Sequence, residues 1–203
     1  MTLAIAGFLA GFVHVLSGPD HLAAIAPYAV DGKNRAWRTG VRWGFGHAIG
    51  ALAVGLLVLA LREALPVEVI SAWSERLVGF VLIGIGIWGI RAVFTRARRV
   101  PGHRESHVHG NAAFGVGTLH GVAGSAHLVG MLPALALPSD FAAGSYLLLF
   151  GLGSVAAMGG FASLVGWISG RPGATGPRAQ GALLGLSALF AVAVGGFWII
   201  GSA

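Results

Sequence analysis

The sequence predicts an all-α membrane protein of six transmembrane helices. They form two inverted three-helix repeats, and the first helix of each repeat is interrupted. Three observations lead to this prediction: the composition, the length of the apolar stretches, and a repeated pattern of histidine, glycine and proline. Of the 203 residues, 56% are hydrophobic and 10% are charged, whereas a soluble protein carries about 25% charged residues. So few charges cannot cover a soluble surface, and the lack of cysteine excludes disulfides and thiolate metal ligands.

Six apolar stretches are long enough to cross a bilayer, which takes about 20 residues per helix. They cover residues 2–30, 41–61, 77–94, 112–137, 141–169 and 181–203. The breaks between them are short, so we expect residues 1–203 to form a single transmembrane domain. The apolar N-terminus lacks the basic segment and cleavage site of a signal peptide, and we expect it in the mature protein.

The basic residues are spread unevenly over the five breaks. The first, third and fifth breaks, with their flanks, hold eleven of the 13 Lys and Arg residues, whereas the second holds Arg62 and Arg76. Because basic loops stay in the cytoplasm, we expect these three breaks to be cytoplasmic and both termini to lie outside. The expected location is a bacterial cytoplasmic membrane. The net charge of +6 is then a sign of orientation and not of nucleic-acid binding.

An internal repeat relates the two halves of the chain. Residues 6–27 align with residues 112–133 at a constant offset of 106, and both contain the pattern His-x3-Gly-x2-His-Leu-x4-Pro. Repeat one covers about residues 2–95 and repeat two about residues 112–203, joined by a histidine-containing cytoplasmic loop over about residues 96–111. Three helices per half place the halves in opposite orientations, which is the plan of many secondary transporters.

The first apolar stretch contains the dipeptide Gly18-Pro19. Proline has no amide hydrogen and glycine weakens a helix. As one straight helix, this stretch would span about 43 Å, more than the roughly 30 Å hydrocarbon core. We therefore expect an interruption around residues 17–20. Asp20 lies beside it, and an ionisable side chain inside a bilayer usually marks an ion or proton pathway.

Histidines accompany this carboxylate inside the predicted spans. Imidazole suits divalent nickel, cobalt, copper and zinc, whereas calcium or magnesium would need several oxygen ligands. The predicted metal site consists of His14, Asp20, His21, His47, His120 and His127. For each histidine alone, an interhelical hydrogen bond is the alternative. The predicted loop adds His103, His107 and His109, which either collect metal or belong to a solvated segment.

At these residues the sequence resembles the nickel/cobalt transporter family. The run from His14 to Ile25 is similar to the family signature, a histidine followed shortly by Asp-His on an early helix. The segments Gly18–Ala24, Trp43–His47 and Leu132–Ser139 are similar to a compact six-span branch described as nickel permeases or urease-accessory membrane proteins. Two features depart from the family: the first histidine and the aspartate are separated by five residues instead of four, and longer members have eight spans. The resemblance implies translocation of divalent nickel or cobalt, with these residues in the metal path: His14, Asp20 and His21.

The first function that these patterns indicate is secondary transport of a divalent transition metal. No nucleotide-binding loop is present in the sequence, so the driving force would be an ion gradient, the membrane potential or a partner protein. The alternatives are an intramembrane metal-dependent hydrolase, in which the His/Asp site activates water, and a haem-binding membrane protein. Two inverted halves favour transport over both. We therefore expect no enzymatic activity, no cofactor, the metal ion as substrate, and the lipid bilayer but no nucleic acid as partner.

Overall fold

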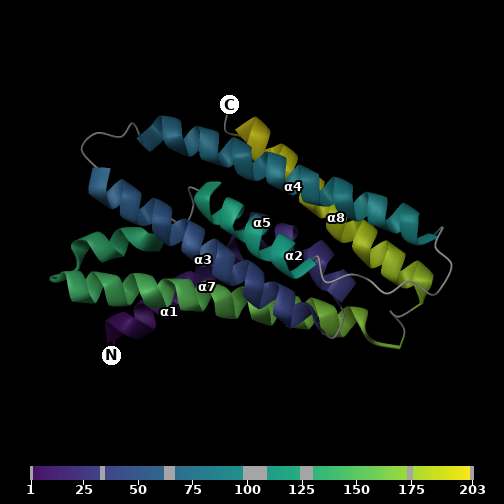
Figure 1. Ribbon diagram of the computed structural model, residues 1–203, viewed down its shortest axis with the longest axis horizontal. Helices are drawn as coiled ribbons and strands as arrows, with labels where there is room; N and C mark the ends of the chain where they lie inside the picture. Colours follow the sequence, from purple (N-terminus) through teal and green to yellow (C-terminus); the bar gives the residue numbers. More distant parts are fainter. Residues whose placement is uncertain are drawn as a thin grey trace.

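The computed structural model describes residues 2–32, 35–61, 67–97, 109–123, 130–172 and 176–201. Within these ranges the chain forms helices and no β-strand, so the all-α prediction is confirmed. Figure 1 shows an elongated bundle. Its helices are α1 (Thr2–Ser17), α2 (Pro19–Gly32), α3 (Ala36–Leu61), α4 (Val67–Ala97), α5 (His109–Ala123), the 3-10 helix η2 (Leu132–Ala136), α7 (Asp140–Ser169) and α8 (Pro177–Gly201).

Among the described residues, four helices are long and apolar enough to cross a membrane, as in an integral membrane protein. The spans are Ala36–Leu57 of α3, Arg76–Thr95 of α4, Asp140–Ser169 of α7 and Arg178–Gly201 of α8. Helices α1 and α2 together qualify as one further, broken span. The predicted fourth span, residues 112–137, is described as α5 and η2, while residues 124–129 lie outside the described part. Six spans therefore stay a prediction, with four to five recognised among the described residues.

The break between α1 and α2 follows from the dipeptide Gly18-Pro19. Proline has no amide hydrogen with which to continue the helix. Instead, the Gly18 amide closes α1 on the His14 carbonyl at 3.1 Å, and the Gly18 carbonyl accepts from the His21 amide at 3.1 Å. The two helices are bent by 74°. The predicted interruption around residues 17–20 is confirmed, whereas its counterpart in the second half falls largely on residues outside the described ranges.

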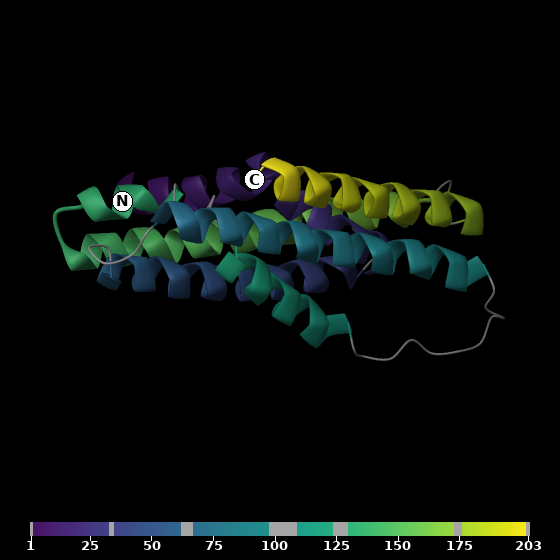
Figure 2. The same ribbon diagram turned by 90° about the horizontal axis from the view of Figure 1, so that it is seen from above.

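The helices associate in pairs whose members come from different halves of the chain. Helix α1 packs on α7, α3 packs on α5, and α4 packs on α8, while α3 and α7 meet in the middle. Figure 2 shows α4 and α8 side by side along their length. Glycines permit the close approach: a Cβ at Gly11 of α1 would meet the backbone of Phe150, and one at Gly117 of α5 would meet the backbone of Trp43.

These two contacts are counterparts of each other. Gly11 and Gly117 are related by the offset of 106, while Trp43 and Phe150 precede the similar segments Gly44–His47 and Gly151–Ser154. The same holds one step further, since a Cβ at Gly46 would meet the Phe114 carbonyl and one at Gly153 would meet the Phe8 carbonyl. The α1–α7 contact thus has the same form as the α3–α5 contact. This is the pattern that two related halves would produce.

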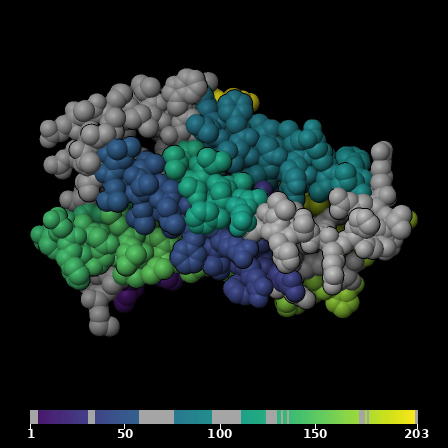
Figure 3. Space-filling model, viewed as in Figure 1, coloured from purple at the N-terminus to yellow at the C-terminus, as the bar shows by residue number. Residues whose placement is uncertain are grey.

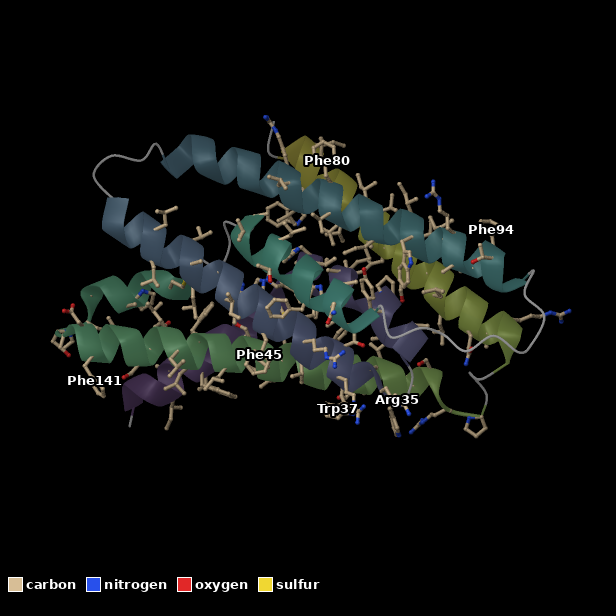
Figure 4. The ribbon with its side chains drawn as sticks, in the orientation of Figure 1. Arg35, Trp37, Phe45, Phe80, Phe94 and Phe141 are labelled. Atoms are coloured by element: carbon tan, nitrogen blue, oxygen red, sulfur yellow. The ribbon has the colours of Figure 1, made fainter. Side chains whose placement is uncertain are left out.

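The helix ends next to the basic breaks gather at one end of the bundle. In Figure 1, α3 and α8 begin, and α4 and α7 end, on the right of the view. Figure 3 shows α5 next to α3 on one face, between α4 and α7. Large apolar side chains such as Phe80, Phe94 and Phe141 are exposed and point away from the bundle (Figure 4). Outward apolar side chains suit helices surrounded by lipid.

Candidate metal centre

Five of the six predicted metal-site residues come together where α1, α2, α3 and α5 meet. His14 lies one turn before the end of α1, and His47 and His120 lie within α3 and α5. Asp20 and His21 occupy the first turn of α2, directly after the break. The histidines of this cluster come from both halves of the predicted repeat. We call these residues the imidazole cluster: His14, Asp20, His21, His47 and His120.

The remaining predicted residues lie elsewhere. His127, the sixth predicted metal-site residue, is outside the described residues, as are His103 and His107 of the predicted loop. His109 is the first residue of α5, so the structure places it on a helix and not in the loop that the sequence predicts. Helix α5 extends three residues before the apolar stretch starts, because a helix can continue beyond the hydrocarbon core.

His21 occupies the middle of the cluster. Its ring centroid lies 4.7 Å from that of His14, 4.8 Å from that of His47 and 5.0 Å from that of His120. The bend at Gly18 is what allows this, because it turns the start of α2 back toward the last turn of α1. Three imidazoles from three different helices therefore surround a fourth.

Asp20 bridges two of these imidazoles. Its Oδ1 lies 3.1 Å from Nδ1 of His21, and its Oδ2 lies 3.1 Å from Nε2 of His120. A carboxylate in these positions accepts a hydrogen from each ring and fixes the ring orientation. The other nitrogens, Nε2 of His21 and Nδ1 of His120, are buried without a hydrogen-bond partner among the described residues. A neutral imidazole that donates through one nitrogen offers the other as a metal ligand.

The cluster is almost completely buried. Asp20 is 3% exposed and His21 2%, whereas His47 and His120 have no exposed surface and His14 is half-buried. An isolated buried carboxylate is costly, so its two ring partners stabilise it, as does its place in the first turn of α2, where the helix dipole favours negative charge.

The spacing of these side chains is close to that of a metal site. Two groups of three have candidate ligand atoms within 4.8 Å of one another: His14 with His21 and His47, and Asp20 with His21 and His120. Three ligand atoms that each lie about 2.1 Å from one ion are about 3.4–3.6 Å apart. Side chains would therefore have to approach one another by up to about 1 Å to bind an ion. The chemistry of the donor set fits a borderline divalent transition metal.

Two aromatic side chains that were not among the predicted site residues complete the surroundings. The Trp43 ring lies 5.7 Å from that of His47, with 8° between the planes, and 5.1 Å from that of His120. The Phe150 ring lies 5.4 Å from that of His14. Both side chains are fully buried. The spacing of four residues between Trp43 and His47 is a signal for the first, because it places them on one helix face.

Comparisons with known proteins identify three curated relatives. The chain is 37% identical over 213 residues to Chloroplast protein FOR GROWTH AND FERTILITY 1 of Arabidopsis thaliana, and 39% identical over 207 residues to FOR GROWTH AND FERTILITY 2. Each alignment covers 96% of this chain but only 58% and 55% of the plant proteins, so the chain spans little more than half their length. It is also 29% identical over 178 residues to Urease accessory protein UreH of a Bacillus species, covering 79% of this chain and 74% of that protein.

The other two comparisons give no match. No family model matches the chain, and no solved structure matches it significantly.

Proposed function

We propose that this protein is a secondary membrane transporter of divalent transition-metal ions, with nickel or cobalt as its cargo. The observation that supports it most is the buried imidazole cluster, in which one carboxylate and four imidazoles converge from four helices of a membrane protein. Imidazole nitrogens suit these borderline cations, and the single carboxylate offsets part of their charge. Ionisable side chains inside a membrane usually mark a substrate, ion or proton pathway.

The pairing of the helices supports transport in preference to an intramembrane hydrolase or a haem protein. The matched glycine contacts of α1 with α7 and of α3 with α5 are those expected of two inverted three-helix repeats. Inverted repeats give a protein two related conformations that open the same central site to opposite sides. A hydrolase needs one site open to water and gains nothing from this arrangement.

The relatives are in line with the proposal. The Bacillus relative is named a urease accessory protein, and the segments Gly18–Ala24 and Trp43–His47 resemble a nickel-permease branch that includes proteins of that description. The names of the plant relatives place them in the chloroplast and state no cargo. The cluster that we propose as the metal path lies within residues 14–120, inside the part of the chain aligned with the plant proteins.

Metal uptake into liposomes tests this function. Asp20→Ala removes the carboxylate that orients His21 and His120, and we expect it to abolish nickel and cobalt uptake while the helical fold survives. The matched control replaces the three predicted loop histidines, His103, His107 and His109, by alanine and should transport normally at saturating metal. Proton and sodium gradients imposed in either direction identify the coupling ion.

The two variants have opposite expected outcomes, which makes the comparison decisive. A loop variant without transport beside an active Asp20→Ala variant would contradict the intramembrane site. His14→Ala and His21→Ala should behave as Asp20→Ala does, because neighbouring apolar side chains cannot replace a metal ligand. Substitutions of His47, His120 and His127 should act in the same direction with smaller and more variable effects.

A further inference from the structure

The imidazole cluster lies between two aromatic side chains that belong to different parts of the core. Trp43 is part of the larger buried cluster, which includes Val15 and Met158. Phe150 belongs to a separate small cluster with Ala51 and Met131. The polar residues therefore divide the apolar core, with one aromatic ring on each side of the division.

Each ring faces the imidazole of its own helix pair. Trp43 on α3 lies 5.1 Å from His120 on α5, and Phe150 on α7 lies 5.4 Å from His14 on α1. His14 and His120 are counterparts at the offset of 106, and the run Trp43-Gly-Phe-Gly-His47 corresponds to Phe150-Gly-Leu-Gly-Ser154. The two ring-on-imidazole contacts are thus counterparts, and each joins the ring of one half to the histidine of the other.

The antiparallel course of α3 and α7 places these rings at different heights. A Cβ at Gly44 would meet Val155 and Met158, whereas Gly151 lies opposite Ala48, so the residue numbers run in opposite directions along the contact. Phe150 shares its cluster with Ala51, eight residues beyond Trp43 on α3. At 1.5 Å per residue this separates the two rings by about 12 Å along the bundle.

His47 lies between these two heights, so each ring lies between the imidazole cluster and a different end of the bundle. Trp43 lies one turn from His47 toward the start of α3, and α3 begins at the end of the bundle with the basic breaks (Figure 1). Phe150 lies on the side toward the start of α7, whose first residue, Asp140, is at the opposite end of the bundle. Its ring also packs where a Cβ at Gly130 would be, at 2.6 Å from Cε2, so it is held between His14 and the chain before η2.

We propose that Trp43 and Phe150 are the two gates of the transport site, one contributed by each half and each closing one side of the imidazole cluster. This inference rests on the proposed transport function and adds which side chains keep the site closed. Each gate moves with its own helix pair, because the backbone of Trp43 touches Gly117 of α5 and that of Phe150 touches Gly11 of α1. A tilt of one pair against the other then frees one ring at a time.

The native chain suits a direct test because it has no cysteine. Ser154→Cys places a single thiol at a fully buried position on α7, one turn from Phe150 and at a height between the two rings. The Ser154 hydroxyl lies within hydrogen-bond distance of the carbonyls of Phe150, at 2.9 Å, and Gly11, at 3.3 Å, and a thiol is close to a hydroxyl in shape. A charged, membrane-impermeant methanethiosulfonate reagent is added to either side of vesicles of known orientation, with no metal present.

Each variant is expected to raise the labelling rate from one side of the membrane only. Added to the Ser154→Cys background, Phe150→Ala should raise the labelling rate only from the side of Asp140, and Trp43→Ala only from the side of the basic breaks. An increase of about tenfold would correspond to opening that is easier by about 1.4 kcal/mol. Leu82→Ala, which truncates a fully buried side chain in the α4–α8 contact, is the matched control and should change neither side.

A variant that loosens the packing of the whole bundle gives a different result, because it accelerates labelling from both sides of the membrane. Equal acceleration from both sides, acceleration from the same side by both variants, or no acceleration would overturn the proposal. If the alanine variants do not fold, Trp43→Phe and Phe150→Leu replace them, with a smaller increase expected on the same sides. Labelling needs no metal. If each variant is labelled faster from its expected side but the protein takes up neither nickel nor cobalt, the proposed cargo is refuted and the assignment of the two gates stands.

Discussion

Gly117 tests whether the close approach of α5 to α3 builds the metal centre. A methyl group at this position would press on the Trp43 carbonyl and would lie 3.0 Å and 3.1 Å from the carbonyl carbon and Cα of Trp43. All three atoms belong to the backbone and cannot rotate away. Carbon atoms pack best at 3.5–4.0 Å, so Gly117→Ala must push the two helices apart by about 0.5–1 Å at this level.

The magnitude follows from a matched position on the same helix. Overpacking a tight contact costs about 1–3 kcal/mol. At Gly115 an added Cβ meets nothing within 4 Å, and alanine there should gain up to about 1 kcal/mol of helix propensity. Alanine gains the same helix propensity at both positions, so the free energies of unfolding of the two variants should differ by the overpacking cost alone, about 1–3 kcal/mol.

Two measurements on the purified variants check this expectation. Denaturant or thermal unfolding in detergent reports the stability difference, and nickel uptake reports the site. His120 lies one turn beyond Gly117, and its 3.1 Å contact with Asp20 would not survive an outward shift of α5 by 1 Å. Gly117→Ala should thus lose uptake and Gly115→Ala should keep it. Equal stability of the two variants would refute the close helix contact.

Two further predictions concern the break and the orientation. A Cβ at Gly18 would press on Nδ1 of His21 and lie 2.9 Å from Oδ1 of Asp20, which are movable side-chain atoms. Gly18→Ala should therefore weaken nickel binding, measured by calorimetry, with little change in the melting temperature; Gly160→Ala, where an added Cβ meets nothing within 4 Å, is its control, and unchanged binding would contradict the expectation. A reporter fused after Ala203 should lie outside the cytoplasm, since the basic breaks are at the other end; cytoplasmic reporter activity would reverse the proposed orientation.

Local features of the sequence predicted the broken first helix correctly. The missing amide hydrogen of Pro19 acts wherever the residue is placed, so the break needs no knowledge of the rest of the fold. The helix ends were harder, because hydropathy marks the part of a helix inside the membrane and not the whole helix. Helix α4 begins at Val67, ten residues before the apolar stretch, with Glu68 and Glu75 in its first part.

The contacts that assemble the site could not be predicted from the sequence patterns. Asp20 and His120 are 100 residues apart, and their contact depends on how α2 and α5 pack. Trp43 and Phe150 were not predicted as site residues, because a large apolar side chain on a membrane helix has the same sequence signature whether it faces lipid or a buried imidazole. The repeat could have suggested them as a pair, since both precede similar glycine-containing segments.

The exchange of partners between the halves has a consequence for biosynthesis. Helix α1 finds its main partner, α7, only after more than a hundred further residues have been made, and α3 waits for α5 until after α4 has been made. Until then the glycine-lined faces of α1 and α3 have only lipid to contact. Neither half contains the partners that its own helices require, so a chain interrupted midway leaves both helices unmatched. The order in which the helices leave the ribosome therefore differs from the order in which they can pair.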